Sequence, residues 1–147
     1  MRILFVCLGN ICRSPTAEGV MRRLVRDEGL EDRIEIDSAG TGGWHVGAPP
    51  DERATEAAAC RGIELSGSAR RFDPRDFDRF DLIVAMDAEN RRDLLAVAPD
   101  DDARRKVRMF RAGDGDVPDP YYGGEDGFER VLDMVEEAAR ELLDEIR

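Results

Sequence analysis

The stretch that decides the fold reads VCLGNICRSP and occupies residues 6–15. An apolar run, residues 3–6, leads into it, and Pro15 opens an amphipathic pattern behind it. This order predicts a buried strand, then a tight loop, then the first turn of a helix. Such a loop presents several backbone N–H groups and the positive end of a helix dipole, and both favour a bound anion.

Two side chains of this stretch point to phosphoryl transfer without a metal. The loop is expected to lower the pKa of the Cys7 thiol from about 8.5 to roughly 3.5–7.5, which makes it a thiolate nucleophile. Arg13 supplies a planar guanidinium that can bind two phosphate oxygens at once. A buried structural cysteine is the alternative for Cys7. A nucleotide-binding loop is excluded, because Lys106 is the only lysine and the Gly-Lys motif is absent.

Composition narrows the class of protein. The 147 residues are expected to form one domain, residues 1–147, and the apolar fraction of 41% is that of a globular protein. Neither a membrane span nor a signal peptide is recognisable, so a cytoplasmic location is expected. The formal net charge of −11 argues against nucleic acid and anionic membranes as partners. Three cysteines and one histidine predict neither a disulfide scaffold nor a metal site.

Apolar residues recur with strand or helix periodicity along the chain. We expect Ser14 and Asp51 to be the N-caps of the first two helices. The alternation of strands and helices predicts an α/β fold with a four-stranded parallel sheet, helices on both faces, and a phosphate-binding loop after strand 1. This architecture is flavodoxin-like or Rossmann-like. The predicted strands are residues 2–6, 33–37, 81–86 and 106–110, and the predicted helices are residues 15–28, 51–60, 87–97 and 127–146.

A leaving group needs a proton, so a carboxylic acid must face the nucleophile. The chain has 33 acidic residues, and composition alone cannot select one of them. Asp119 stands out by its setting in the loop of residues 114–126, where Pro120 stiffens the chain and two tyrosines follow. A solvated turn aspartate is the alternative.

Five motifs resemble the low molecular weight protein tyrosine phosphatases, in order and over essentially the whole chain. They are residues 6–15, Asp-Ser-Ala-Gly-Thr at 37–41, Trp44 with Pro-Asp at 50–51, Met-Asp-x-x-Asn at 86–90, and Asp-Pro-Tyr-Tyr at 119–122.

The resemblance implies a role for each site residue. Cys7 is then the nucleophile, Arg13 binds the phosphate and the transition state, and Asp119 is the general acid and base. Ser14 lowers the pKa of the thiol and helps it leave. The loop itself is built by Leu8, Gly9, Asn10, Ile11 and Cys12, with Asn10 in a strained left-handed conformation and Ser38 in support. The family's histidine falls near Gly67, where this chain has none, so that contact must be replaced or absent.

Cys12 has two readings. It can fill space beneath the loop, or, as the resemblance implies, it can form a reversible disulfide with Cys7 that protects the nucleophile. The substrate rim is expected to comprise Leu8, Trp44, Tyr121 and Tyr122, deep enough to favour phosphotyrosine over phosphoserine. His45 is expected on an exposed loop and receives no catalytic task.

Three other functions remain as alternatives. Protein arginine phosphatases of the same family carry threonine where this chain has Ile11. Arsenate reductases need two further cysteines in a later loop, and Cys60 alone cannot supply them. A catalytically dead binding module would lack the nucleophile or the acid. The implied partners are phosphotyrosine-containing proteins, such as a tyrosine kinase; no cofactor is implied, and a monomer with at most weak self-association is expected.

Overall fold

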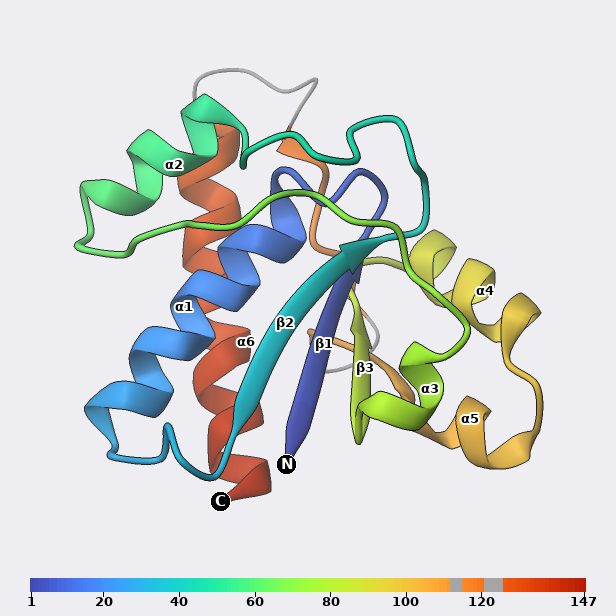
Figure 1. The fold of residues 1–147 in the computed structure, drawn as a ribbon. Coiled ribbons are helices and arrows are strands. Elements are labelled where there is room, and N and C mark those ends of the chain that lie inside the picture. Colours follow the sequence, from blue (N-terminus) through green and yellow to red (C-terminus); the bar gives the residue numbers. More distant parts are fainter. Residues whose placement is uncertain (112–114, 121–125) are drawn as a thin grey trace.

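A computed structural model describes residues 1–111, 115–120 and 126–147 of the chain. Strands and helices alternate along most of it (Figure 1). In chain order the elements are β1 (Arg2–Cys7), α1 (Arg13–Asp27), β2 (Glu35–Gly40), α2 (Glu52–Ala59), α3 (Asp76–Arg79), β3 (Leu82–Ala85), α4 (Ala88–Val97), α5 (Asp101–Lys106), β4 (Val107–Met109) and α6 (Gly127–Ile146).

The four strands form one parallel sheet in the order β2-β1-β3-β4. The predicted four-stranded parallel α/β sheet is therefore confirmed. The chain leaves β1 toward β2 on one side and later adds β3 on the other side of β1. A sheet of this kind opens a crevice at the carboxyl end of the strand where the winding reverses. Cys7 is the last residue of that strand.

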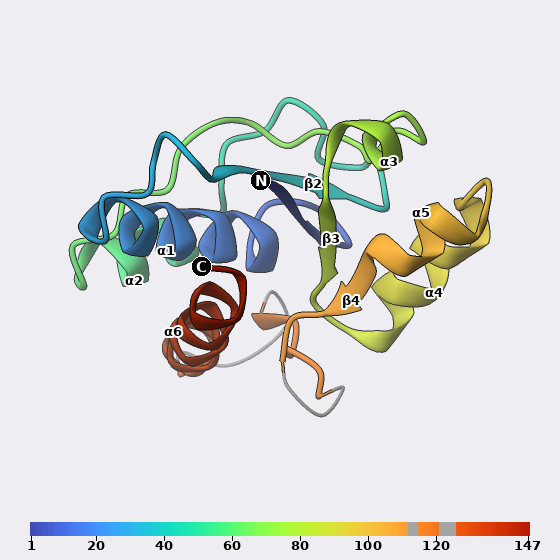
Figure 2. The same ribbon diagram turned by 90° about the horizontal axis from the view of Figure 1, so that it is seen from below.

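Helices cover both faces of the sheet (Figures 1 and 2). Successive residues of a strand point to opposite faces, so β1 serves two hydrophobic clusters. Ile3, Phe5 and Cys7 pack with residues of α1, α2 and α6, whereas Leu4 and Val6 pack with residues of α3, α4 and α5. Residues 3–6 are all apolar because both faces of this strand are covered by helices.

The start of α1 differs from the prediction. Ser14 is not the N-cap: the helix begins at Arg13, and the cap residue Cys12 makes no side-chain capping bond. The hydroxyl of Ser14 is instead engaged with Cys7 and Asn10 at the loop. Asp51 does cap α2, where it accepts hydrogen bonds from two backbone N–H groups of the first turn, so that prediction is confirmed.

Two short helices, α3 and α5, were not predicted. Within α5 only Ala103 is buried, so the segment carries no apolar periodicity. Asp100 caps it and three basic residues end it, which is favourable for a helix dipole. As a result Lys106 belongs to this helix, and β4 is limited to Val107–Met109 rather than residues 106–110.

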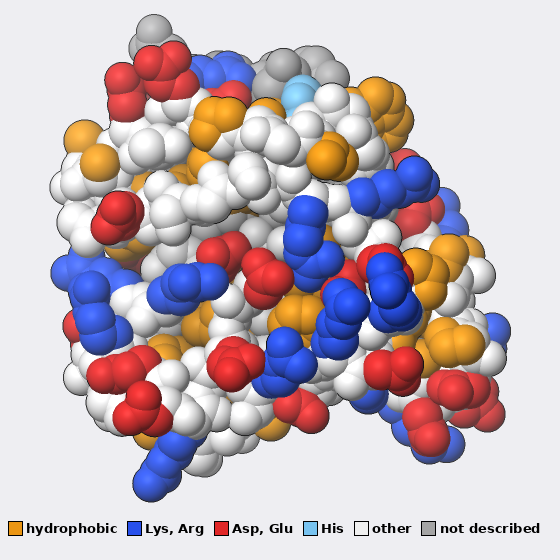
Figure 3. All heavy atoms as spheres, viewed as in Figure 1, with side chains coloured by type: hydrophobic (Ala, Val, Ile, Leu, Met, Phe, Trp, Pro, Cys, Tyr) orange, Lys and Arg blue, Asp and Glu red, His pale blue; other side chains and the backbone are white. Residues whose placement is uncertain are grey.

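Charges of both signs are intermixed on the face seen in Figure 3. Oppositely charged side chains pair in the structure, as in Arg2–Glu35, Arg70–Asp37 and Arg75–Asp73. Among the residues that the structure describes, no helix is long and apolar enough to cross a membrane.

Candidate active site

Residues 8–12 form the β1–α1 loop, and Cys7 lies at its start. The thiol is buried, with 2% of the residue exposed. Its Sγ lies 3.0 Å from Ser14 Oγ and accepts a hydrogen bond from the backbone N–H of Asn10 at 3.3 Å. A sulfur with two donors directed at it is suited to carry negative charge.

Asn10 holds the loop in its shape. Its φ of 57° is in the left-handed region, as the resemblance implied. Its Nδ2 donates to Ser14 Oγ at 2.8 Å and to Ser38 Oγ at 3.0 Å, and its Oδ1 accepts from the backbone N–H of Arg70 at 3.0 Å. The hydrogen bonds of the Asn10 amide are thereby made by two serine hydroxyls and one backbone N–H, none of which belongs to a histidine.

The loop offers its backbone to an anion. Within the described part of the chain, the N–H groups of Leu8, Gly9, Ile11 and Cys12 donate to no other residue. They follow a strand and precede the N-terminus of α1. Unpaired N–H groups in this setting form a nest for a tetrahedral oxyanion.

Arg13 is anchored by residues far away in the sequence. Its NH1 donates to Asp87 Oδ2 at 2.5 Å and to the Val117 carbonyl at 3.0 Å, and its NH2 lies 3.6 Å from Asp119 Oδ2. Burial opposes the charge of this guanidinium, but Cys7 and Asp87 nevertheless raise its pKa. Arg13 therefore remains a cation even though only 3% of it is exposed.

Sequence reasoning assigned no role to Asp87 or Val117. Asp87 belongs to the motif at residues 86–90 and directly follows Met86, the residue after β3. Because the carboxyl ends of parallel strands share one edge of the sheet, its position beside Cys7 could have been inferred.

A cavity of about 270 Å³ brings the predicted catalytic groups together. Cys7 and Arg13 line it along with Asp119, whose side chain is about one-third exposed. Leu8 and Trp44 lie at its mouth and are 38% and 75% exposed. The described residues that line it are Cys7, Leu8, Gly9, Ile11, Cys12, Arg13, Trp44, His45 and Asp119. Tyr121 and Tyr122, the other predicted rim residues, lie outside the described residues.

His45 lies in the cavity wall, not simply on an exposed loop. It is half-buried, and a Cβ placed on Gly9 would lie 2.9 Å from its Cδ2. The imidazole therefore packs closely on the β1–α1 loop, which only a glycine at position 9 allows.

Cys12 lines the same cavity as Cys7. Burial, together with the nearby Asp51 and Cys7, raises the pKa of its thiol to about 12. Cys12 is thus an un-ionised thiol at neutral pH.

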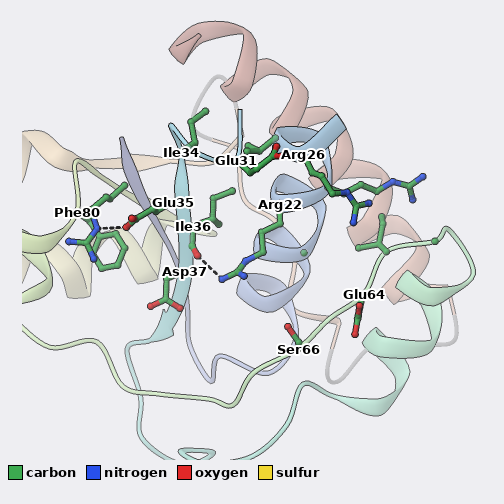
Figure 4. Close-up of a pocket in the computed structure, with 16 residues that line it drawn as sticks. Arg22, Arg26, Glu31, Ile34, Glu35, Ile36, Asp37, Glu64, Ser66 and Phe80 are labelled. Atoms are coloured by element: carbon green, nitrogen blue, oxygen red, sulfur yellow. Dashed lines mark hydrogen bonds and ion pairs between the residues drawn. The ribbon is translucent and has the colours of Figure 1, made fainter. Parts of the chain in front are cut away.

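A larger cavity lies elsewhere, between α1 and the outer edge of β2, with a volume of about 850 Å³ (Figure 4). Both arginines and carboxylates line it, and Arg22 donates to the Ile36 carbonyl at 2.7 Å. Of the predicted site residues that the structure describes, none lines this cavity.

Comparisons with known proteins agree with the geometry. Residues 2–147 match the family model described as low molecular weight phosphotyrosine protein phosphatase. A putative low molecular weight protein-tyrosine-phosphatase of Synechocystis is 51% identical over 97% of this chain and 94% of its own length. A low molecular weight protein-tyrosine-phosphatase of Streptomyces coelicolor is 50% identical over 99% and 93%. The crystal structure of a protein tyrosine phosphatase from Entamoeba histolytica superposes with a TM-score of 0.94 at 40% identity, covering 99% of this chain and 96% of that one.

Proposed function

The chain belongs to the low molecular weight phosphotyrosine protein phosphatase family, and we propose that it hydrolyses phosphotyrosine in proteins through a phosphocysteine intermediate. The observation that carries this proposal is the meeting of Cys7, Arg13 and Asp119 around one cavity. A nucleophile, a phosphate-binding cation and a proton donor are the three groups that the reaction needs.

In the first step the Cys7 thiolate attacks phosphorus and the bond from phosphorus to the tyrosyl oxygen breaks. The leaving oxygen takes the proton of Asp119, so the protein departs with an uncharged tyrosyl hydroxyl and a phosphocysteine remains. The equatorial oxygens are held by Arg13 and by the N–H groups of the β1–α1 loop. Asp87 fixes one nitrogen of the guanidinium, so the fork is oriented before the substrate enters.

In the second step the Asp119 carboxylate takes a proton from water, and the water oxygen attacks phosphorus. The bond from sulfur to phosphorus breaks, and inorganic phosphate is released. Sulfur leaves as a thiolate, and the Ser14 hydroxyl at 3.0 Å donates to it. Ser14 therefore assists the departure of the nucleophile.

Substrate choice depends on the mouth of the cavity. Leu8 and Trp44 are apolar and exposed there, and they flank the path to the buried Cys7. An aromatic phosphoester can pack between such walls and still reach the sulfur. Ile11, in place of threonine, favours phosphotyrosine over phosphoarginine.

Hydrolysis of phosphotyrosyl peptide, compared with phosphoarginyl peptide and arsenate, tests the proposed function. We expect turnover of the phosphotyrosyl peptide in EDTA, because Arg13 and the loop supply the positive charge. A preference for phosphoarginine would assign the rival phosphatase activity, and arsenate reduction would assign the reductase. If none of these substrates is turned over, the catalytically inactive binding module would be the remaining alternative.

Gly42→Ala is predicted to weaken substrate binding through Trp44. A Cβ at Gly42 would lie 1.9 Å from Cζ3 of Trp44, so the indole must move. We expect KM for phosphotyrosyl peptide to rise roughly 2- to 10-fold, the size of a lost aromatic contact, with kcat nearly unchanged. Gly43→Ala is the matched control, because its Cβ would meet nothing closer than Arg71 Cδ at 3.7 Å. Equal KM values for the two variants would contradict a role of Trp44.

Cys12 is proposed to protect the nucleophile from oxidation. Peroxide oxidises the Cys7 thiolate to a sulfenic acid; the Cys12 sulfur then displaces the hydroxyl, water leaves, and a Cys7–Cys12 disulfide forms. After peroxide, added thiol should restore the wild type fully but Cys12→Ser only in small part, with Cys60→Ser as control. Because the pKa of Cys12 is about 12, the protected fraction should increase as pH is raised above neutral. Equal recovery of activity in Cys12→Ser and in the wild type would refute a protective role of Cys12.

The cytoplasmic location, the monomeric state and a tyrosine kinase as substrate stay predictions. Substrate trapping from a lysate with Asp119→Ala addresses the last of these.

A further inference from the structure

A line of hydrogen bonds runs from the nucleophile to a partly buried glutamate behind the loop. Cys7 Sγ contacts Ser14 Oγ at 3.0 Å, and Ser14 Oγ accepts from Asn10 Nδ2 at 2.8 Å. The same Nδ2 donates to Ser38 Oγ at 3.0 Å, and Ser38 Oγ donates to Glu18 Oε1 at 2.6 Å. The mechanism proposed above uses Cys7 and Ser14 of this line and leaves Glu18 without a task.

The direction of each bond in this line follows from the chemistry of the groups. The Arg70 N–H donates to Asn10 Oδ1, so the NH₂ group of Asn10 must face the two serines. Each serine oxygen then accepts from Asn10 and directs its own proton away. The Ser14 proton can go to the sulfur at 3.0 Å, which a thiolate favours, or to the more distant Ala39 carbonyl at 3.4 Å, and the Ser38 proton goes to the carboxylate of Glu18. An ionised Glu18 is a strong acceptor for the Ser38 proton and therefore favours this arrangement.

Glu18 has the surroundings of a group that can change its charge. Its side chain is only 13% exposed and lies 3.0 Å from Arg22 of the same helix. Asp37 of β2 and Arg70 of the segment before α3 also face it. Burial raises the pKa of Glu18, although Ser38, Arg22 and Arg70 oppose the rise.

A cavity behind the loop gives protons access to this carboxylate. Its volume is about 280 Å³, and Asn10, Glu18 and Ser38 contribute to its wall. Gly67 also lines it, and no atom lies within 4 Å of where a side chain of Gly67 would begin. Glu18 is therefore accessible from the side of the loop opposite to the substrate.

We propose that Glu18 is a positioning residue for the reaction at Cys7: its carboxylate orients Ser38, and through Asn10 it fixes the Ser14 donor that faces the sulfur. The proposal rests on the proposed function. Protonation of Glu18 removes the charged acceptor of the Ser38 hydroxyl, which is then free to turn. The Ser38 oxygen then no longer accepts from Asn10 Nδ2 in a fixed direction, so Asn10 holds the Ser14 hydroxyl less firmly and the thiolate leaves phosphorus less readily.

Glu18→Gln tests this role, since it keeps the size of the side chain and removes its charge. We expect kcat at pH 7.5 to fall roughly 3- to 10-fold, as for other residues that act through a network, with KM little changed. The loss should disappear below the pKa of Glu18, where the wild type also carries a neutral side chain. Glu28→Gln, at the end of the same helix, removes the same charge and should keep the wild-type kcat and pH profile.

Thermal unfolding separates positioning from a merely structural role. Since folding raises the pKa of Glu18, its contribution to stability is present at low pH and is lost as pH rises through that pKa. At pH 7.5 the Tm of Glu18→Gln should therefore equal or exceed that of the wild type, although its kcat is lower. A Tm that falls together with kcat would overturn the proposal.

A double-mutant cycle with Ser38→Ala tests the route. If Glu18 acts through Ser38, Glu18→Gln should have no further effect on kcat in the Ser38→Ala background. Additive effects, or equal pH profiles of wild type and Glu18→Gln, would refute the proposal. An inactive wild type would instead refute the proposed function. In that case the rate of Cys7 alkylation by iodoacetamide still reports on the sulfur, and it should still respond to Glu18→Gln only when Ser38 is present.

Discussion

Replacing Cys7 by serine should reduce the hydrolysis of phosphotyrosyl peptide by roughly 10⁶-fold, the scale of losing the nucleophile of a hydrolase. A serine hydroxyl in this position would be hard to activate, because among the described residues the hydrogen-bond partners of the sulfur are the Ser14 hydroxyl and the Asn10 N–H. Both are donors that stabilise an anion already formed, and neither removes a proton. Steady-state turnover with a discontinuous phosphate assay measures the loss.

The same variant should still bind phosphate. Arg13 keeps its anchors at Asp87 and Val117, and the N–H groups of the β1–α1 loop do not depend on the sulfur. Calorimetric titration with inorganic phosphate should therefore give a Kd within about tenfold of the wild type, or 1.4 kcal/mol. Cys60→Ser is the matched control, since Cys60 is exposed and should leave turnover unchanged. Activity of Cys7→Ser within tenfold of the wild type would exclude a thiolate nucleophile.

The sequence predicts best those parts of the site whose residues lie close together in the chain. Cys7 and Arg13 stand six positions apart between a strand and a helix, so secondary structure alone brings them to one loop. Ser14 was assigned as a helix cap because its position before Pro15 fits one, but the sulfur and Asn10 compete for its hydroxyl. The preference of Ser14 for the helix cap is thus outweighed by its contacts with Cys7 and Asn10.

The sequence pattern does not predict contacts between residues that are far apart in the chain. Asp87 is 74 residues from Arg13, and the Arg70 N–H is 60 residues from Asn10. The second of these is a backbone group, so no side-chain motif records it. Short elements are also hard to predict from sequence. Helix α5 has one buried residue and so no apolar periodicity, and its stability comes from capping and from packing against neighbouring elements.

Asp119→Asn should lower kcat for phosphotyrosyl peptide by roughly 10²- to 10⁴-fold, the usual contribution of a positioned general acid. The asparagine keeps the size of the side chain beside Arg13 NH2, which lies 3.6 Å from the carboxylate, so phosphate binding should persist. Tyrosine is a poor leaving group because its pKa is about 10 and its oxygen requires a proton. With p-nitrophenyl phosphate, a better leaving group, the loss in the first step should be much smaller.

The two steps should then separate in time. Asp119 is also the base for the water that attacks phosphocysteine, so the second step stays slow whatever the leaving group. Rapid mixing of Asp119→Asn with p-nitrophenyl phosphate should therefore give a burst of nitrophenol, close to one per active site, before slow turnover. Asp116→Asn is the matched control in the same loop: its carboxylate accepts from the Ala88 N–H at 3.0 Å and does not line the cavity. An equal loss for both leaving groups without a burst would mean that Asp119 supports the loop and transfers no proton.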